Sequence, residues 1–118
     1  MTIKARSRIK SLGCAIAGII HVAQHEPNMR IHLGCGAIAV SAGMWLRIDA
    51  ESWRWVALSL ALVTSAECLN TAVERVCDVA DPQFNPLIKQ AKDAAAGAVL
   101  LTAAFAMWIG IALVFEYF

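Results

Sequence analysis

The sequence predicts an all-α membrane protein, in which an amphipathic surface helix precedes three transmembrane helices. Composition is the first observation: 59% of the 118 residues are hydrophobic and 16% are charged, whereas soluble domains are about half apolar and a quarter charged. The second observation is that the mean hydropathy of +0.62 comes from long uncharged runs. The length of 118 residues predicts one domain over residues 1–118.

Residues 3–24 have the pattern of a basic amphipathic helix. The apolar side chains of one face recur at steps of three and four: Ile9, Leu12, Ile16, Ile19 and Ala23. Lys4 and Arg8 fall largely on another face. Such a helix suits a membrane surface with anionic headgroups. An ordinary bundle helix is the alternative.

Three transmembrane helices are predicted, over residues 28–48, 53–79 and 91–117. The first begins after Pro27, which favours a helix start. Its central run at 31–46 carries no formal charge, and neither does the run at 94–115 in the third helix. About 20 residues are needed to cross the hydrocarbon core, so each predicted helix is long enough.

The basic residues fix the orientation. Eight lie on one side of the predicted spans and two, Arg47 and Arg54, on the other. The eight are Lys4, Arg6, Arg8, Lys10, Arg30, Arg75, Lys89 and Lys92. The positive-inside rule then places the N-terminus and the 79–91 loop in the cytoplasm, at a cytoplasmic (inner) membrane crossed several times. No cleavable signal peptide is evident, and a net charge of +1 gives no case for nucleic-acid binding. The four cysteines form no CxxC pair, which argues against a zinc site.

The second span carries polar residues on one face. Glu67, Asn70 and Glu74 are spaced i, i+3 and i+7. An acid at the centre of a membrane helix costs roughly 2.5–3.5 kcal/mol, and such a cost usually marks a functional site. Contact between helices is the structural alternative. Glu67 lies about 10 Å deeper than Glu74 at the helical rise, so it can meet a lipid headgroup while Glu74 meets a soluble ligand.

Other charged residues are predicted at the same cytoplasmic level. Glu26 precedes the first span, and Lys92 and Asp93 lie at the start of the third. Paired carboxylates suit Mg²⁺, and a lysine suits the charge of a transferring phosphoryl group. The deeper Glu67 could orient or deprotonate an attacking hydroxyl. The sequence contains no P-loop and no glycine-rich kinase loop, which excludes a soluble-kinase architecture.

Three segments carry a resemblance to a known family. The run from Glu67 to Asp78, ECLNTAVERVCD, resembles the ExxNTAxExxxD segment of the prokaryotic diacylglycerol kinase and undecaprenol kinase family. The run from Asn85 to Leu100 resembles its HPxxKxAKDxxAGAVL segment, with Asn85 where His is common. Residues 26–32, EPNMRIH, resemble its ExNxRxH segment. The N-terminal helix also matches, through Arg8, Ser11, Ala15 and Gly18, with Leu12 where an aromatic residue is common.

The resemblance implies a homotrimer of three-span subunits with active sites between subunits. It implies that the acids matching Glu26 and Glu74 hold the metal of Mg-ATP, with Mg²⁺ as cofactor and ATP as co-substrate. The acid matching Glu67 is implied to be the general base, with Asn70 beside it. The remaining candidates for nucleotide binding are Lys92 at the phosphates, Asp93 on the nucleotide side, and Arg8 from the N-terminal helix.

The expected function is phosphorylation of a membrane lipid alcohol by ATP at the cytoplasmic face. The ExNxRxH form, with Asn28, Arg30 and His32, looks more like the undecaprenol-preferring branch, and both undecaprenol and diacylglycerol stay open as the acceptor. One alternative is a non-enzymatic structural or regulatory membrane protein whose acids join helices. A cation transporter using Glu67 and Glu74 as a relay is disfavoured, because the other charges gather on one side.

Overall fold

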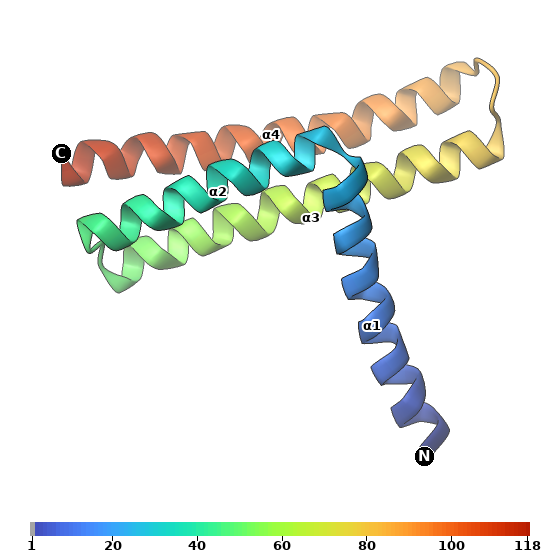
Figure 1. Ribbon diagram of the computed structural model, residues 1–118. Helices are drawn as coiled ribbons and strands as arrows, with labels where there is room; N and C mark the ends of the chain where they lie inside the picture. Colours follow the sequence, from blue (N-terminus) through green and yellow to red (C-terminus); the bar gives the residue numbers. More distant parts are fainter. Residues whose placement is uncertain (1) are drawn as a thin grey trace.

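The computed structural model describes residues 2–118, with side chains from residue 7 onward. The side chains of Lys4 and Arg6, which entered the charge count, lie outside that described part. The described chain forms four helices: α1 (Thr2–His25), α2 (Pro27–Leu46), α3 (Ala50–Ala80) and α4 (Pro86–Tyr117). Figure 1 shows α2, α3 and α4 running along a common direction and α1 projecting away from them. The predicted all-α fold, with three spans and an N-terminal helix, is therefore confirmed.

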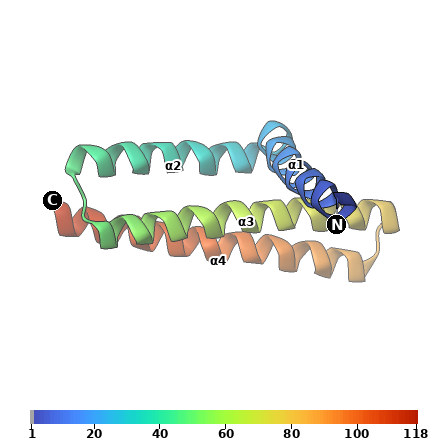
Figure 2. The same ribbon diagram turned by 90° about the horizontal axis from the view of Figure 1, so that it is seen from below.

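The three later helices are long and apolar enough to cross a membrane, with 20, 31 and 32 residues. Since α1 runs across their common direction (Figure 2), it would lie along the bilayer surface if they cross it. Its exposed side chains include the apolar Ile9 and Leu12, which an interfacial helix inserts among lipids. This geometry agrees with the surface helix predicted from the sequence.

The helix boundaries differ from the predicted ones at two caps. α3 begins at Ala50 rather than at residue 53, because the Asp49 side chain accepts a hydrogen bond from the Ser52 backbone N–H at 2.8 Å. α4 begins at Pro86 rather than at residue 91. There the Asn85 side chain accepts from Leu87 N–H at 2.9 Å, and proline suits the first turn of a helix. The α2–α3 connection is therefore only residues 47–49, and Lys92 and Asp93 sit inside α4 rather than at its start.

The helices pack unequally. α3 and α4 form a long antiparallel hairpin, and α2 packs against α3 while standing apart from α4 (Figure 2). Few apolar side chains are buried; examples are Met29 in α2 and Val63 in α3. Large ones such as Trp45 and Phe115 are 77% and 82% exposed. So large an apolar surface has to be covered by lipid or by further subunits.

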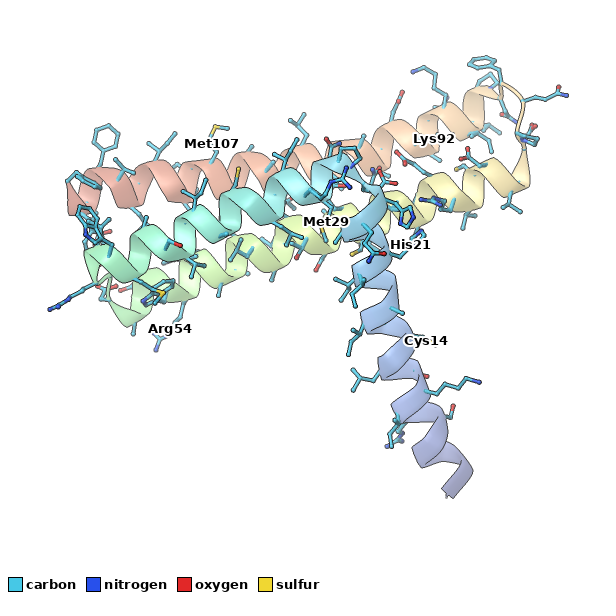
Figure 3. The ribbon with its side chains drawn as sticks, in the orientation of Figure 1. Cys14, His21, Met29, Arg54, Lys92 and Met107 are labelled. Carbon is cyan, nitrogen blue, oxygen red and sulfur yellow. The ribbon has the colours of Figure 1, made fainter. Side chains whose placement is uncertain are left out.

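Register sets the level of the polar residues. The first turns of α2 lie beside the middle of α3, as the contact between His32 and Glu67 shows. α3 then continues for 13 residues, to Ala80, which is about 20 Å at the helical rise. The start of α4, with Lys92, runs beside this extension (Figure 3). The orientation predicted from the basic residues would make this extension the cytoplasmic end of the molecule.

Candidate functional site

Glu67 is the most deeply placed acid of the predicted site. Its side chain is 2% exposed, and His32 Nε2 on α2 lies 3.2 Å from its Oε1. The two groups are within ion-pair distance, yet no hydrogen bond of good geometry from the described residues reaches Oε1. Burying a carboxylate without full hydrogen bonding is costly. A buried carboxylate that lacks a hydrogen-bond partner indicates a site where a ligand or another group supplies that partner.

Asn70 and Glu74 follow on the same face of α3. Asn70 Nδ2 donates to Glu74 Oε1 over a long 3.4 Å. Asn70 Oδ1 is buried without a partner in the part of the chain that the structure describes, as is the Oγ1 of the neighbouring Thr71. These oxygens are free to accept a hydrogen bond or to coordinate a cation. The predicted group of Glu67, Asn70 and Glu74 therefore forms one continuous polar stripe.

Glu26 reaches the same end of the molecule from the α1–α2 junction. It occupies the residue before α2 without capping the helix through its side chain. Its Oε1 lies 3.5 Å from Arg75 Nη2 of α3, at the long limit of a hydrogen bond. Arg75 is 54% exposed, and exposed ion pairs of this kind contribute little stability. The Glu26 carboxylate is therefore held loosely near α3.

The cations of α4 are held more tightly. Lys92 Nζ donates to Asp78 Oδ1 at 2.7 Å across the α3–α4 hairpin. Lys89 Nζ donates to Asp93 Oδ2 at 2.6 Å, one turn along α4. Lys92 and Asp93 are thus each already paired with an opposite charge. An anionic ligand at Lys92 would have to share it with Asp78.

A single chain leaves Arg8 outside this group. Arg8 is exposed on α1, 18 residues before Glu26, which corresponds to about 27 Å of helix. α1 projects away from the bundle in that direction (Figure 1). Within one chain, then, Glu26 and the predicted residues on α3 and α4 lie toward the same end of the bundle, and Arg8 does not join them.

Sequence reasoning missed three partners within this group. Asp78 belongs to the quoted motif and lies one turn after Glu74, a signal that could have marked it. Arg75 was counted only for orientation. His32 belongs to the EPNMRIH segment, but its contact with Glu67 depends on the register of α2 against α3, which the sequence does not give.

The donor chemistry fits magnesium. The described residues contain no cluster of three or more His, Cys, Asp or Glu side chains that could hold a metal ion. Mg²⁺, however, is usually held by one or two carboxylates together with phosphate oxygens and water. Glu26 and Glu74 have only long contacts of 3.5 and 3.4 Å, and the unpartnered Asn70 Oδ1 is a further oxygen donor. These residues can therefore supply the protein's share of a magnesium–nucleotide site.

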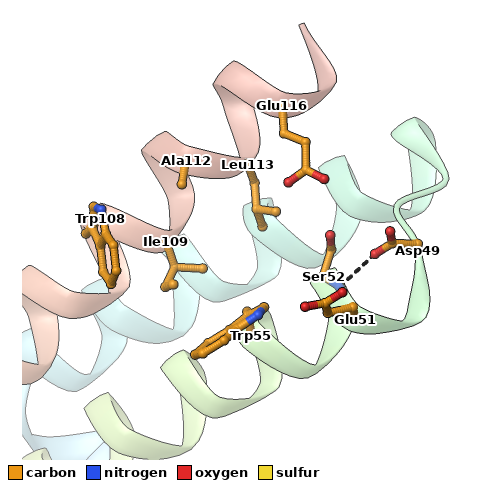
Figure 4. A pocket seen from close by; sticks show the side chains of 9 residues that line it. All are labelled: Asp49, Glu51, Ser52, Trp55, Trp108, Ile109, Ala112, Leu113 and Glu116. Atoms are coloured by element: carbon orange, nitrogen blue, oxygen red, sulfur yellow. Dashed lines mark hydrogen bonds between the residues drawn. The ribbon is translucent and has the colours of Figure 1, made fainter.

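Two hollows lie along the bundle. One is a groove of about 530 Å³ between α2 and α3, lined by Leu33, Gly36, Ala37, Val40, Ser41, Leu60, Ala61 and Thr64. It begins at the residue after His32, so it leads away from Glu67 along an apolar surface. The other hollow, of about 260 Å³, lies where the start of α3 meets the end of α4, and its lining includes Trp55 and Trp108 (Figure 4). Of the two, only the groove adjoins the polar stripe.

Comparison with known proteins places this arrangement in a family. Residues 13–114 match the family model described as prokaryotic diacylglycerol kinase. The chain is 34% identical over 102 residues to undecaprenol kinase of Bacillus subtilis, covering 86% of this chain and 83% of that protein. It is 29% identical over 110 residues to diacylglycerol kinase of Escherichia coli, covering 93% and 90%.

A diacylglycerol kinase of Synechocystis is 38% identical over 107 residues, covering 90% of this chain and 61% of that protein. The chain thus spans about three fifths of the length of that relative and most of the length of the other two. The residues that match the family model, 13–114, include α2, α3 and nearly all of α4. They include every proposed site residue except Arg8. This chain, with its three long apolar helices and its buried acid, belongs to the prokaryotic diacylglycerol kinase family of membrane lipid kinases.

Proposed function

We propose that this protein transfers the γ-phosphate of ATP to the hydroxyl of a membrane lipid, diacylglycerol or undecaprenol, at the cytoplasmic face of the cell membrane. The observation that carries the proposal is the polar stripe on α3. It joins a buried carboxylate, Glu67, to a partly exposed one, Glu74, so that one carboxylate can serve the lipid and the other the nucleotide. A lipid alcohol stays in the bilayer and a nucleotide stays in water, so their common site has to span this boundary.

Glu67 acts as the general base in this proposal. Its carboxylate accepts the proton of the lipid hydroxyl as the hydroxyl oxygen attacks the γ-phosphorus, and ADP leaves with the electrons of the broken P–O bond. Burial keeps water, a competing acceptor, away from the base. Asn70, one turn along, orients the reacting groups with its unpartnered Oδ1.

The remaining residues bind the nucleotide. Glu26 and Glu74 would hold Mg²⁺; charge neutralisation on the β- and γ-phosphates is what the bound ion supplies. Lys92 turns from Asp78 to the phosphates and stabilises their charge. Asp93 lies on the nucleotide side of the site. Arg8 approaches from the α1 helix of a neighbouring subunit, because its own helix leads it away.

This last point favours a homotrimer with sites between subunits. Three helices of this length cannot enclose a substrate, and in a single chain α2 stands apart from α4. A neighbouring helix would cover the exposed apolar faces and complete the stripe of Glu67, Asn70 and Thr71. A non-enzymatic role for the acids would require these oxygens to be paired with other helices in the assembly.

The experiment is phosphate transfer by the purified protein in detergent. It is given Mg-ATP with a radiolabelled γ-phosphate and either undecaprenol or diacylglycerol, then both lipids in competition. The proposal predicts a labelled lipid phosphate with at least one acceptor and none when Mg²⁺ is chelated. A folded protein that labels neither lipid would refute the kinase assignment, and the competition ratio identifies the preferred acceptor.

A further inference from the structure

We infer that His32 is a positioning residue for Glu67, holding its carboxylate so that one oxygen faces the lipid hydroxyl. This inference rests on the proposed role of Glu67 as the base. It goes beyond that role because it assigns the orientation of the base to a side chain on another helix, α2.

The contact itself is the first argument. His32 Nε2 lies 3.2 Å from Glu67 Oε1, and no other described side chain forms a hydrogen bond or an ion pair with this carboxylate. A buried carboxylate that had no donor at all would be strongly destabilised. His32 is therefore the group that decides which way the carboxylate points.

Geometry gives the second argument. The contact is close, yet it is not aligned as a hydrogen bond. The imidazole ring turns about a broad, soft torsion, so a modest rotation aligns the Nε2–H donor with Oε1. Substrate or subunit contacts can make that adjustment. With Oε1 occupied by His32, the second oxygen, Oε2, is left for the hydroxyl proton.

Location gives the third argument. The His32 side chain is 22% exposed and the Glu67 side chain is 2% exposed, so His32 is the member of the pair that a molecule at the surface of the bundle can reach. The next residue, Leu33, begins the apolar groove between α2 and α3. His32 thus stands where the polar stripe meets an apolar surface, and a lipid hydroxyl has to approach at such a boundary.

The test is a matched pair of amide substitutions in the full-length protein. His32→Gln places an amide N–H close to the position of Nε2, whereas His32→Asn places it near Nδ1, out of reach of Glu67. His32→Leu removes the donor altogether. We expect His32→Asn and His32→Leu to lower kcat roughly 10- to 100-fold, the worth of a hydrogen bond to a charged group. His32→Gln should stay within a few-fold of wild type, and the KM for ATP should change little in all three.

Matched controls are His21→Gln, His21→Asn and His21→Leu. His21 is an exposed histidine on α1 that stacks on His25, and these changes should leave kcat unaltered. Size-exclusion chromatography and thermal unfolding report the fold of each variant. Should His32→Leu fail to fold, the two amides decide the question between them.

Three results would overturn the inference: wild-type kcat in His32→Asn, equal losses in His32→Asn and His32→Gln, or a loss confined to the KM for ATP. Equal losses in the two amides would indicate that the ring accepts a proton rather than orients the base. Wild-type protein run in the same assay separates this from the function itself. An inactive wild type refutes the kinase proposal, whereas an active wild type with unaffected His32 variants refutes only the role of His32.

Discussion

Both ends of α3 carry acidic side chains, but these side chains differ in how fully they are hydrogen-bonded. At the outer end, the carboxylate of Asp49 caps the helix by accepting from Ser52 N–H at 2.8 Å. The Asp49 backbone N–H in turn donates to the Tyr117 hydroxyl of α4 at 3.0 Å. The end of the α3–α4 hairpin is therefore closed by short hydrogen bonds.

The half of α3 that begins at Glu67 has few completed hydrogen bonds. Three of the four buried side-chain atoms without a partner among the described residues are there: Glu67 Oε1, Asn70 Oδ1 and Thr71 Oγ1. The contacts of Glu74 and Glu26 are long, at 3.4 and 3.5 Å. Each unmade bond of a buried polar group costs about 1–3 kcal/mol, so this part of the fold gives up stability that the outer end keeps.

The difference shows that hydrogen bonding, rather than the number of acids, separates a structural end from a functional one. The outer pocket also contains three acids, Asp49, Glu51 and Glu116. At that end the Asp49 carboxylate caps the helix, whereas the oxygens of the stripe on α3 remain available to a ligand. The comparison predicts that acids of the two ends respond differently to the same substitution.

The largest expected difference is between Glu67→Gln and Glu116→Gln. We expect Glu67→Gln to lower kcat by about 10²–10⁴-fold, the usual contribution of general base catalysis, while the protein stays folded. Glu116→Gln removes one charge at the other end, where no general base is proposed, and should leave kcat within about a factor of two of wild type. Initial rates of lipid phosphorylation measure both. Similar rates for the two variants would remove the distinction between the ends.

A smaller difference is expected between the two lysines of α4. Lys92→Met should lower kcat/KM for ATP roughly 10- to 100-fold, because a charge-assisted hydrogen bond to phosphate is lost. Lys89→Met loses only the pair with Asp93 within one helix, and such pairs are weak. Rates at varied ATP concentration test this. A larger loss of kcat/KM for ATP in Lys89→Met than in Lys92→Met would indicate that Lys89, and not Lys92, binds the phosphates.

A substitution that disturbs the packing of α2 against α3 at the outer end should lower stability without altering catalysis. A Cβ at Gly43 would lie 2.8 Å from Trp53 Cη2, and the Trp ring cannot yield easily. Gly43→Ala should lower the free energy of unfolding by about 1–3 kcal/mol, the usual cost of overpacking. Gly34→Ala, with nothing within 4 Å of the added Cβ, is the control and should be neutral or stabilising. Detergent-based unfolding curves measure both, and equal behaviour would contradict the close α2–α3 approach.

The smallest expected effect is a pH dependence at the outer cap. The hydrogen bond from the Ser52 backbone lowers the pKa of Asp49 below its usual 3.8. A lowered carboxyl pKa contributes stability above the unfolded-state pKa, and this stability is lost as the pH falls through the folded-state pKa. Wild type should therefore lose more thermal stability than Asp49→Asn between pH 7 and pH 3, because asparagine cannot titrate. Parallel losses in the two proteins would show that the cap carries no charge-dependent stability.

Much of the fold follows from local features of the sequence. The long uncharged runs predict three spans, and the steps of three and four predict α1. The boundaries shift because Asp49 and Asn85 act as caps, which a hydropathy pattern does not reveal. The stripe of Glu67, Asn70 and Glu74 was predictable because its members share one helix.

Contacts between helices were not predictable in the same way. The pairing of His32 with Glu67 depends on the register of α2 against α3. The pairing of Lys92 with Asp78 depends on how the α3–α4 hairpin is aligned. The place of Arg8 in the site would depend on the neighbouring subunit proposed above.

The most direct test of the central claim is binding of a non-hydrolysable Mg-ATP analogue to wild type, Glu67→Gln and Glu74→Gln, measured by calorimetry in detergent. Glu67 serves the lipid and Glu74 the nucleotide in this account. Glu67→Gln should therefore bind the analogue as wild type does, and Glu74→Gln should bind it at least tenfold more weakly, the common effect of losing a metal ligand's interaction. Equal affinities in the two variants, or weaker binding in Glu67→Gln alone, would contradict the division of the α3 stripe between the two substrates.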